Sequence, residues 1–142
     1  MFCKTTDNLN IYFEIQGNES AKETIVFLNG LSQSTVSWIL TTPHFKNEYK
    51  IVLIDFIFQG QSDKTGDWRN FDVHARDVIS VLDHLKIDKA IIAGLSYGSL
   101  VAQYLGVHYG GRISKLILMS TFAVKTPYYE AIELSWWRAL EF

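Results

Sequence analysis

The sequence predicts an α/β fold, in which a mostly parallel β-sheet carries flanking helices. Segments typical of strands alternate with segments typical of helices, and this order favours parallel strands joined by right-handed crossovers. Nearly continuous runs of isoleucine, valine and leucine at residues 25–28, 51–54 and 116–119 indicate strands that are buried on both faces. In such a sheet the chemistry lies at the carboxyl ends of the strands, so the loops there are the candidate sites.

The composition is that of a globular domain. Of the 142 residues, 48% are hydrophobic and 20% are charged, which excludes a disordered chain. The net charge of -2 comes without a basic stripe, and no apolar run reaches the stretch of about 18 residues that spans a membrane. We therefore expect no nucleic-acid partner and no membrane span. Because the N-terminus lacks a secretory signal and Cys3 is the single cysteine, the expected compartment is the cytoplasm.

The first half of the chain is expected to form four strands and one helix. Residues 2–17 are expected to form two short strands around a turn at Asp7-Asn8, with polar and apolar side chains alternating from Asn10 to Glu14. Residues 23–30 and 49–56 contain the apolar runs of two buried strands. Between them, residues 34–42 are expected to form a short helix that Pro43 helps to end.

A longer helix is expected in the middle of the chain. Asn70 can cap its N-terminus, and the helical pattern runs to about Lys86. Its apolar residues recur at helical spacing, whereas His74 and His84 are expected at the surface. The apolar face consists of Phe71, Ala75, Val78, Ile79, Leu82 and Leu85.

The second half of the chain continues the alternation. Residues 89–95 are expected to form a strand, Ser96 to about Tyr109 a helix, and residues 113–121 another strand. Asp55, at the end of an earlier strand, is expected to accept a hydrogen bond from the turn that follows it.

The sequence GLSYG at residues 94–98 has the pattern of a nucleophile elbow. A G-x-S-x-G motif between a strand and a helix holds its serine, here Ser96, on a tight and strained turn. Gly94 and Gly98 would remove side chains that clash in such a turn. The positive end of the following helix would favour an anionic intermediate beside Ser96. The alternative is a glycine-rich turn in which the serine only caps the helix.

A second loop could complete the site. Asn29 and Gly30 end the strand at residues 23–30, and the N–H group of Leu31 could point towards Ser96. Together with the N–H group of Tyr97, it would form the two-donor oxyanion hole of this chemistry. The alternative is an ordinary glycine turn between a strand and a helix.

On these residues the chain resembles the α/β-hydrolase family. The elbow and the surrounding residues 74–120 look like the core helix, elbow and next strand of that family, and the resemblance covers nearly the whole chain. The chain has Asn29 where the family usually has histidine. Residues 55–62 also depart from the family's D-x-R-G-x-G-x-S loop. The resemblance implies a serine hydrolase that acts on an ester-type substrate.

The departures resemble a subgroup of the family. An Asn-Gly pair after the third strand and F-x-G-Q-S at residues 58–62 look like the acyltransferases that join 3-hydroxyacyl chains into rhamnolipid precursors. That subgroup usually lacks the first glycine of the elbow, whereas Gly94 is present here. Hydrolysis and acyl transfer share an acyl-enzyme on the serine and differ in whether water or an alcohol resolves it.

The base and acid of a catalytic triad are missing from the chain. In this fold the acid and the histidine follow the serine in the sequence. His108 lies about 18 Å along the helix that begins at Ser96, at about 1.5 Å per residue, so it cannot act as the base. The other histidines, His44, His74 and His84, precede Ser96 and so do not fit this chain order. Among the later carboxylates, Glu130 and Glu133 resemble solvated helix positions.

The missing triad residues suggest how the chain is organised. Residues 1–122 are expected to be the N-terminal part of an α/β-hydrolase core, and residues 123–142 the start of a cap or connecting segment. The alternative is a terminal helix that docks on this domain's own sheet. The last segment is rich in aromatic residues, namely Tyr128, Tyr129, Trp136, Trp137 and Phe142.

We therefore expect an enzyme that is active in its full-length form on a small-molecule acyl substrate. The 142-residue chain alone is expected to be inactive. A non-catalytic domain and a truncated product remain alternatives. No metal site or cofactor is expected, because no His/Asp cluster has ligand spacing and no nucleotide-binding motif is present. An exposed sheet edge could support a dimer.

Overall fold

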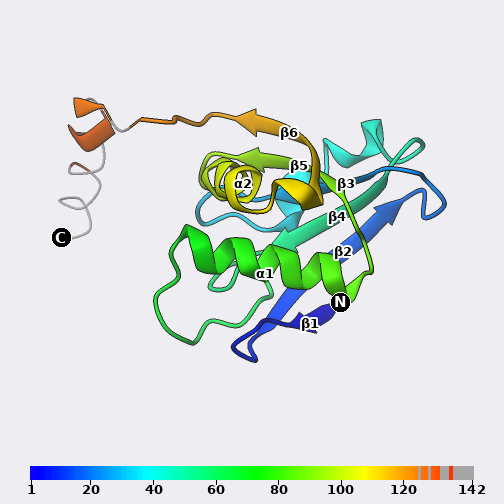
Figure 1. Cartoon of the computed structure of the whole chain (residues 1–142), viewed down its shortest axis with the longest axis horizontal. Coiled ribbons are helices and arrows are strands. Elements are labelled where there is room, and N and C mark those ends of the chain that lie inside the picture. Colours follow the sequence, from blue (N-terminus) through cyan, green and yellow to red (C-terminus); the bar gives the residue numbers. More distant parts are fainter. Residues whose placement is uncertain (125, 128, 132–134, 136–142) are drawn as a thin grey trace.

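A computed structural model describes residues 1–124, 126–127, 129–131 and 135. Within them the chain forms a six-stranded sheet of strand order β1-β2-β4-β3-β5-β6, as Figure 1 shows. The strands are β1 (Phe2–Lys4), β2 (Asn10–Gly17), β3 (Thr24–Leu28), β4 (Lys50–Asp55), β5 (Ala90–Leu95) and β6 (Ile113–Met119). The β1-β2 and β2-β4 pairs are antiparallel, whereas the pairs from β4 to β6 are parallel. The predicted α/β fold is confirmed.

The two α-helices lie on the same face of the sheet (Figure 1). They are α1 (Phe71–His84), which packs against β1 and β2, and α2 (Tyr97–His108), which packs against β3, β5 and β6. The Asn70 side chain accepts a hydrogen bond from the Val73 N–H group at 3.1 Å, so it caps α1 as predicted. A short 3-10 turn, η3 (Gly110–Arg112), leads into β6.

The helix expected at residues 34–42 is instead two short 3-10 turns. They are η1 (Thr35–Trp38), which packs against β4, and η2 (Thr42–His44), which packs against β2. Pro43 lies inside the first residues of η2, so it takes part in the second turn rather than ending a helix. Proline is tolerated there because the first N–H groups of a helix have no partner to lose.

The core has two layers because both faces of the central strands are buried. Val26 and Ile54 lie in the layer under α1 and α2, together with Val78 of α1 and Val101 of α2. The next residues along each strand point to the opposite face, where they pack around Trp38 of η1. This second layer consists of Ile25, Phe27, Ile51, Leu53, Ile91, Ala93 and Trp38.

The prediction that residues 116–119 are buried on both faces is wrong. Leu116, Ile117 and Leu118 of β6 remain 39%, 42% and 41% exposed. β6 is the last strand of the sheet within the described residues, and it pairs only with β5. An apolar run therefore predicts a strand, but it does not predict which faces of the strand are buried.

The prediction that His74 is a surface residue is also wrong. His74 is only 5% exposed and belongs to the buried face of α1, whereas His84 is exposed as expected. Near His74, the buried Arg69 guanidinium bonds both carboxylate oxygens of Asp77 at 3.0 and 2.9 Å. Arg69 also bonds Asp7 at 2.6 Å, and this hydrogen bond is the main cause that holds the pKa of Asp7 below its usual value. The cluster joins α1 to the β1-β2 turn.

The segment after β6 is described only in part. The Tyr129 ring stacks on the Phe122 ring with centroids 4.5 Å apart. Glu130 is exposed, as expected. The other residues for which we stated an expectation, Tyr128, Glu133, Trp136, Trp137 and Phe142, lie outside the described residues.

Candidate active site

Ser96 lies at the corner between β5 and α2, outside both elements. Its backbone has φ 50° and ψ −111°, a conformation that a residue with a side chain rarely adopts, and the residue is exposed. Its N–H group donates to the Met119 carbonyl at the end of β6 (2.9 Å). Its own carbonyl accepts from the Ser99 N–H group at 2.9 Å. The corner is thus held by hydrogen bonds on both sides, which is how a protein maintains local backbone strain.

The two glycines of the motif are needed for close packing. A Cβ atom on Gly94 would lie 2.4 Å from the Gly98 carbonyl oxygen. A Cβ atom on Gly98 would lie 2.3 Å from the Leu28 carbonyl oxygen, at the end of β3. Both contacts are with backbone atoms, which cannot move aside as a flexible side chain can. The start of α2 can therefore approach β3 this closely only with glycine at both positions.

Backbone strain is concentrated at the carboxyl edge of the parallel strands. Ser32 follows β3, Phe58 follows β4, Ser96 follows β5 and Ser120 follows β6, and all four have positive φ angles of 60°, 74°, 50° and 52°. Residues with unfavourable backbone angles gather at functional sites, where the surroundings hold them in place. This edge is also where the sequence predicts the chemistry.

The two predicted oxyanion donors are available for binding. The N–H groups of Leu31 and Tyr97 donate to no acceptor among the described residues, and the Leu31 side chain is 60% exposed. Gly30, which precedes Leu31, has its N–H group bonded to the Gln33 side chain at 2.9 Å. Gln59 also donates to the Gly30 carbonyl at 3.3 Å. The convergence of the two free N–H groups near Ser96 stays a prediction.

Asn29 connects the loop that carries Leu31 to the neighbouring strand β4. It is fully buried, and its side-chain nitrogen donates to the Ile54 carbonyl at 2.8 Å and to the Asp55 carboxylate at 3.1 Å. Its side-chain oxygen accepts from the Trp38 indole at 2.7 Å. The side-chain nitrogen of Asn29 therefore donates hydrogen bonds while its oxygen accepts one, and these bonds anchor the start of the loop at Gly30.

Asp55 holds three segments together, and the sequence revealed only one of these contacts. As predicted, its carboxylate accepts from the turn that follows it, through the Gln61 N–H group at 2.8 Å. It also accepts from the Thr35 N–H group at 2.7 Å, at the end of the loop that carries Leu31. A Cβ atom on Gly60 would overlap this carboxylate, so the glycine lets the turn close over it. The polar residues that end β3 and β4 were the only signal of this network.

Ser99 links the elbow to β6, and the sequence analysis missed it. Its fully buried hydroxyl contacts the Gly94 carbonyl and the Met119 carbonyl, the latter at 2.9 Å, and accepts from the Met119 N–H group at 3.0 Å. Met119 is also the residue that accepts from the Ser96 N–H group. Ser99 therefore fixes the peptide on which the Ser96 backbone depends.

The Tyr97 ring packs into an aromatic cluster under the elbow. Its centroid lies 5.4 Å from Phe71, 5.9 Å from Phe56 and 5.7 Å from His74. Burial raises the pKa of the Tyr97 hydroxyl above its usual value. This packing holds the Tyr97 side chain among the rings of Phe56, Phe71 and His74.

Among the described residues, no hydrogen bond joins a histidine to Ser96. His74 contacts the Tyr97 ring, and its Nδ1 atom lies 3.6 Å from Asp77 within the buried core. His108 stacks on Tyr104 at the last turn of α2, with ring centroids 4.1 Å apart. His44 is in η2, and His84 packs on Phe13 beside β2.

The described part of the chain holds no cluster of three or more possible metal ligands. None of its helices has the length and apolar character that crossing a bilayer requires.

Comparisons with known proteins agree with this geometry. A family model described as alpha/beta hydrolase fold matches residues 23–139. The 3-oxoadipate enol-lactonase 2 of Acinetobacter baylyi is 29% identical over 105 residues, which cover 74% of this chain and 39% of the lactonase. Est816, described as an N-acyl homoserine lactone degrading enzyme, is 30% identical with a TM-score of 0.79, over 85% of this chain and 45% of its own.

A third similar protein is MGS-M2, an alpha/beta hydrolase enzyme from a deep-sea metagenome library of the Medee basin. Its structure superposes with a TM-score of 0.87 at 28% identity, over 96% of this chain and 50% of its own. This chain thus spans half the length of its relatives or less. Because the family model covers most of the chain and the structures superpose on nearly all of it, the chain belongs to the alpha/beta hydrolase fold family.

Proposed function

We propose that the full-length protein is a serine hydrolase of ester-type substrates and that Ser96 is its nucleophile. The observation that carries the proposal is the backbone of Ser96, which is strained, exposed and bonded on both sides at the start of α2. The free N–H groups of Leu31 and Tyr97 support it, because an oxyanion needs donors that are not already paired. Two of its relatives are named for lactones, which are cyclic esters.

The proposed reaction has two steps. The Ser96 hydroxyl loses its proton to a base and forms a bond to the carbonyl carbon, and the oxyanion is held by the two N–H groups. The carbonyl then re-forms as the alcohol leaves with a proton, which gives an acyl-enzyme. Water attacks the acyl-enzyme in the same way and releases the acid and the free serine.

We further propose that residues 1–122 are the N-terminal part of the hydrolase core and that residues 123–142 begin a cap or connecting segment. The triad acid and histidine would then come from a later segment, in the chain order of this fold. The fact that the chain spans half of its relatives' length or less supports this division.

The test compares two lengths of the protein. The 142-residue chain and the chain extended to the natural end of its gene are assayed with p-nitrophenyl esters and with a lactone, each with and without Ser96→Ala. We expect Ser96-dependent turnover from the long form and near-buffer rates from the short form. Losing the base removes most of the rate acceleration. The oxyanion hole alone would contribute an acceleration of about 10²- to 10³-fold over the uncatalysed reaction.

Either of two results would contradict the proposal. Turnover by the short form that depends on Ser96 would show that a base lies within these 142 residues. No turnover by the long form on any ester, lactone or thioester would favour a non-catalytic binding domain.

Adding a 3-hydroxyacyl alcohol as acceptor tests acyl transfer, which would yield a joined ester in place of the free acid.

A further inference from the structure

Phe58 is held in a backbone conformation that suits glycine. Its φ angle is 74°, and its side chain is 43% exposed in the loop after β4. A bulky residue at positive φ is an outlier, because its Cβ atom crowds the backbone.

The surrounding hydrogen bonds define this turn without the Phe58 ring. The Phe58 N–H group donates to the Asp63 carbonyl at 2.8 Å, and the Gln59 N–H group donates to the Phe56 carbonyl at 2.8 Å. The Lys64 ammonium group lies over the turn and bonds three of its carbonyl oxygens. These belong to Gln59, Gly60 and Ser62, at 2.9, 2.6 and 2.7 Å. The turn would therefore keep its shape with glycine at position 58.

Phe58 lies in the loop after β4, which contacts the loop that carries Leu31. The next residue, Gln59, donates to the Gly30 carbonyl at 3.3 Å, and Leu31 follows Gly30. Leu31 and Phe58 are both large, apolar and substantially exposed, at 60% and 43%. β3, which precedes Leu31, lies between β4 and β5 and is parallel to both, so the loops of Leu31 and Phe58 leave the sheet at the same edge as Ser96.

We propose that Phe58 is a specificity-determining residue that contacts the acyl chain of the substrate and selects apolar chains of medium length. This inference rests on the proposed serine-hydrolase function. The Phe58 side chain costs backbone strain, is not needed for the turn, and exposes an apolar ring in a loop that contacts the loop carrying Leu31. Contact with a ligand explains these three features together.

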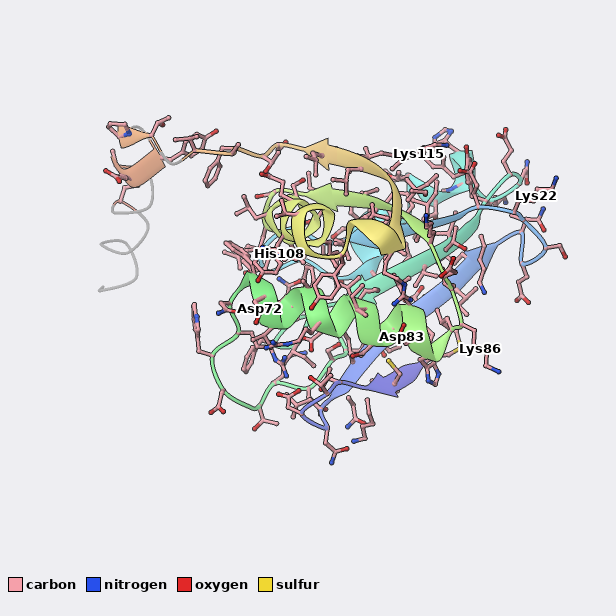
Figure 2. The ribbon with its side chains drawn as sticks, in the orientation of Figure 1. Lys22, Asp72, Asp83, Lys86, His108 and Lys115 are labelled. Atoms are coloured by element: carbon pink, nitrogen blue, oxygen red, sulfur yellow. The ribbon has the colours of Figure 1, made fainter. Side chains whose placement is uncertain are left out.

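The kinetic test uses the protein extended to the natural end of its gene. Wild type, Phe58→Gly and Lys86→Gly are compared on p-nitrophenyl acetate, butyrate and octanoate. Lys86 is the matched control, because it also has a positive φ of 56°. It lies at the opposite end of α1 from Asp72, as Figure 2 shows. We expect Phe58→Gly to lower kcat/KM for the octanoate ester about 10-fold and to leave the acetate ester within about 2-fold.

In the same assay Lys86→Gly should keep the wild-type chain-length profile. Equal losses on all three esters in Phe58→Gly, or no loss on any, would overturn the inference. A thermal unfolding measurement separates selectivity from folding. Because glycine relieves the strain, Phe58→Gly should keep the Tm within about 4 °C of wild type, and a much larger fall would assign the ring to the core instead.

The failure of the proposed function can be told apart from failure of this inference. If no turnover depends on Ser96, the proposed function is wrong. The binding of sodium octanoate is then measured through the shift in Tm that it causes, with sodium acetate as the reference. Weaker octanoate binding by Phe58→Gly than by wild type would support the acyl contact. Equal binding by both, or binding by neither, would overturn it.

Discussion

Asp55 joins the loops that follow β3 and β4. It is 1% exposed and accepts hydrogen bonds from three segments, through Asn29, Thr35 and Gln61. No cation contacts it among the described residues, so neutral donors alone stabilise the carboxylate. A buried donor that loses its acceptor pays its full desolvation cost, which makes such a hub sensitive to substitution.

We expect Asp55→Ala to lower the free energy of unfolding by about 2–4 kcal/mol, because the Thr35 and Gln61 N–H groups lose their acceptor. Urea unfolding of the 142-residue chain measures this loss. Asp67→Ala, at an exposed position of the following loop, serves as control and should change the free energy by less than about 0.5 kcal/mol. Equal effects of the two substitutions would show that the buried network does not stabilise the fold.

Cys3 is a buried thiol with a shifted titration. Burial, followed by the negative charge of Asp77, raises the pKa of the Cys3 thiol from 9.0 to about 11. The unfolded chain therefore releases this proton at lower pH than the folded one. The thiol's contribution to stability is complete below pH 9.0 and is lost as the pH rises towards about 11.

We expect wild type to lose more stability than Cys3→Ala across this alkaline range. Urea unfolding at a series of pH values measures the difference, and the comparison cancels the titration of the other groups. Parallel curves for the two proteins would contradict the shifted pKa. Iodoacetamide should also label the folded wild type slowly, because the reactive thiolate is scarce.

At the scale of one element, the end of α1 shows how a helix can stop without glycine. The Lys86 N–H group donates to the Asp83 carbonyl at 3.0 Å, and the Ile87 N–H group donates to the Leu82 carbonyl at 2.9 Å. These two bonds are those of a Schellman motif, in which the residue at the position of Lys86 is usually glycine. Lys86 adopts the required positive φ of 56° at a cost in strain.

We expect Lys86→Gly to raise the Tm by about 2–4 °C, because glycine takes this conformation without the steric cost of a Cβ atom. Differential scanning calorimetry of the 142-residue chain gives the measurement. Asp88→Gly is the control, since Asp88 is exposed and has no positive φ. A gain from Asp88→Gly as large as that from Lys86→Gly would mean that strain relief is not the cause.

At the scale of the whole molecule, β6 leaves an apolar strand at one end of the sheet (Figure 1). Its outer edge is unpaired among the described residues, and three of its apolar side chains are about two-fifths exposed. Unpaired backbone groups on an apolar edge strand favour pairing with another chain. The dimer that the sequence suggested therefore stays a prediction with a defined surface.

We expect the 142-residue chain to self-associate at high micromolar concentration and Ile117→Lys to reduce this, because a charge on an edge strand opposes pairing. Analytical ultracentrifugation measures the association. Val107→Lys is the control, since Val107 is 78% exposed and belongs to α2 rather than to the edge strand. Wild type that stays monomeric, or an equal effect of both substitutions, would exclude β6 as the contact.

The sequence by itself determined the order of the elements and the location of the elbow. The strands, the two long helices, the Asn70 cap and the corner at Ser96 follow from local patterns, because propensity, capping and glycine spacing act between residues close in the chain. The family resemblance and the predicted position of the site at the carboxyl edge followed from the same patterns.

Only the tertiary structure decided which side chains each element buries and which distant residues meet. It placed His74 in the core, left β6 exposed, and joined Asn29, Asp55 and Trp38 into one buried network. These outcomes depend on how α1 is rotated against the sheet and on which elements cover each strand. Such contacts join residues far apart in the chain, so they stabilise the protein only once packing has brought those residues together.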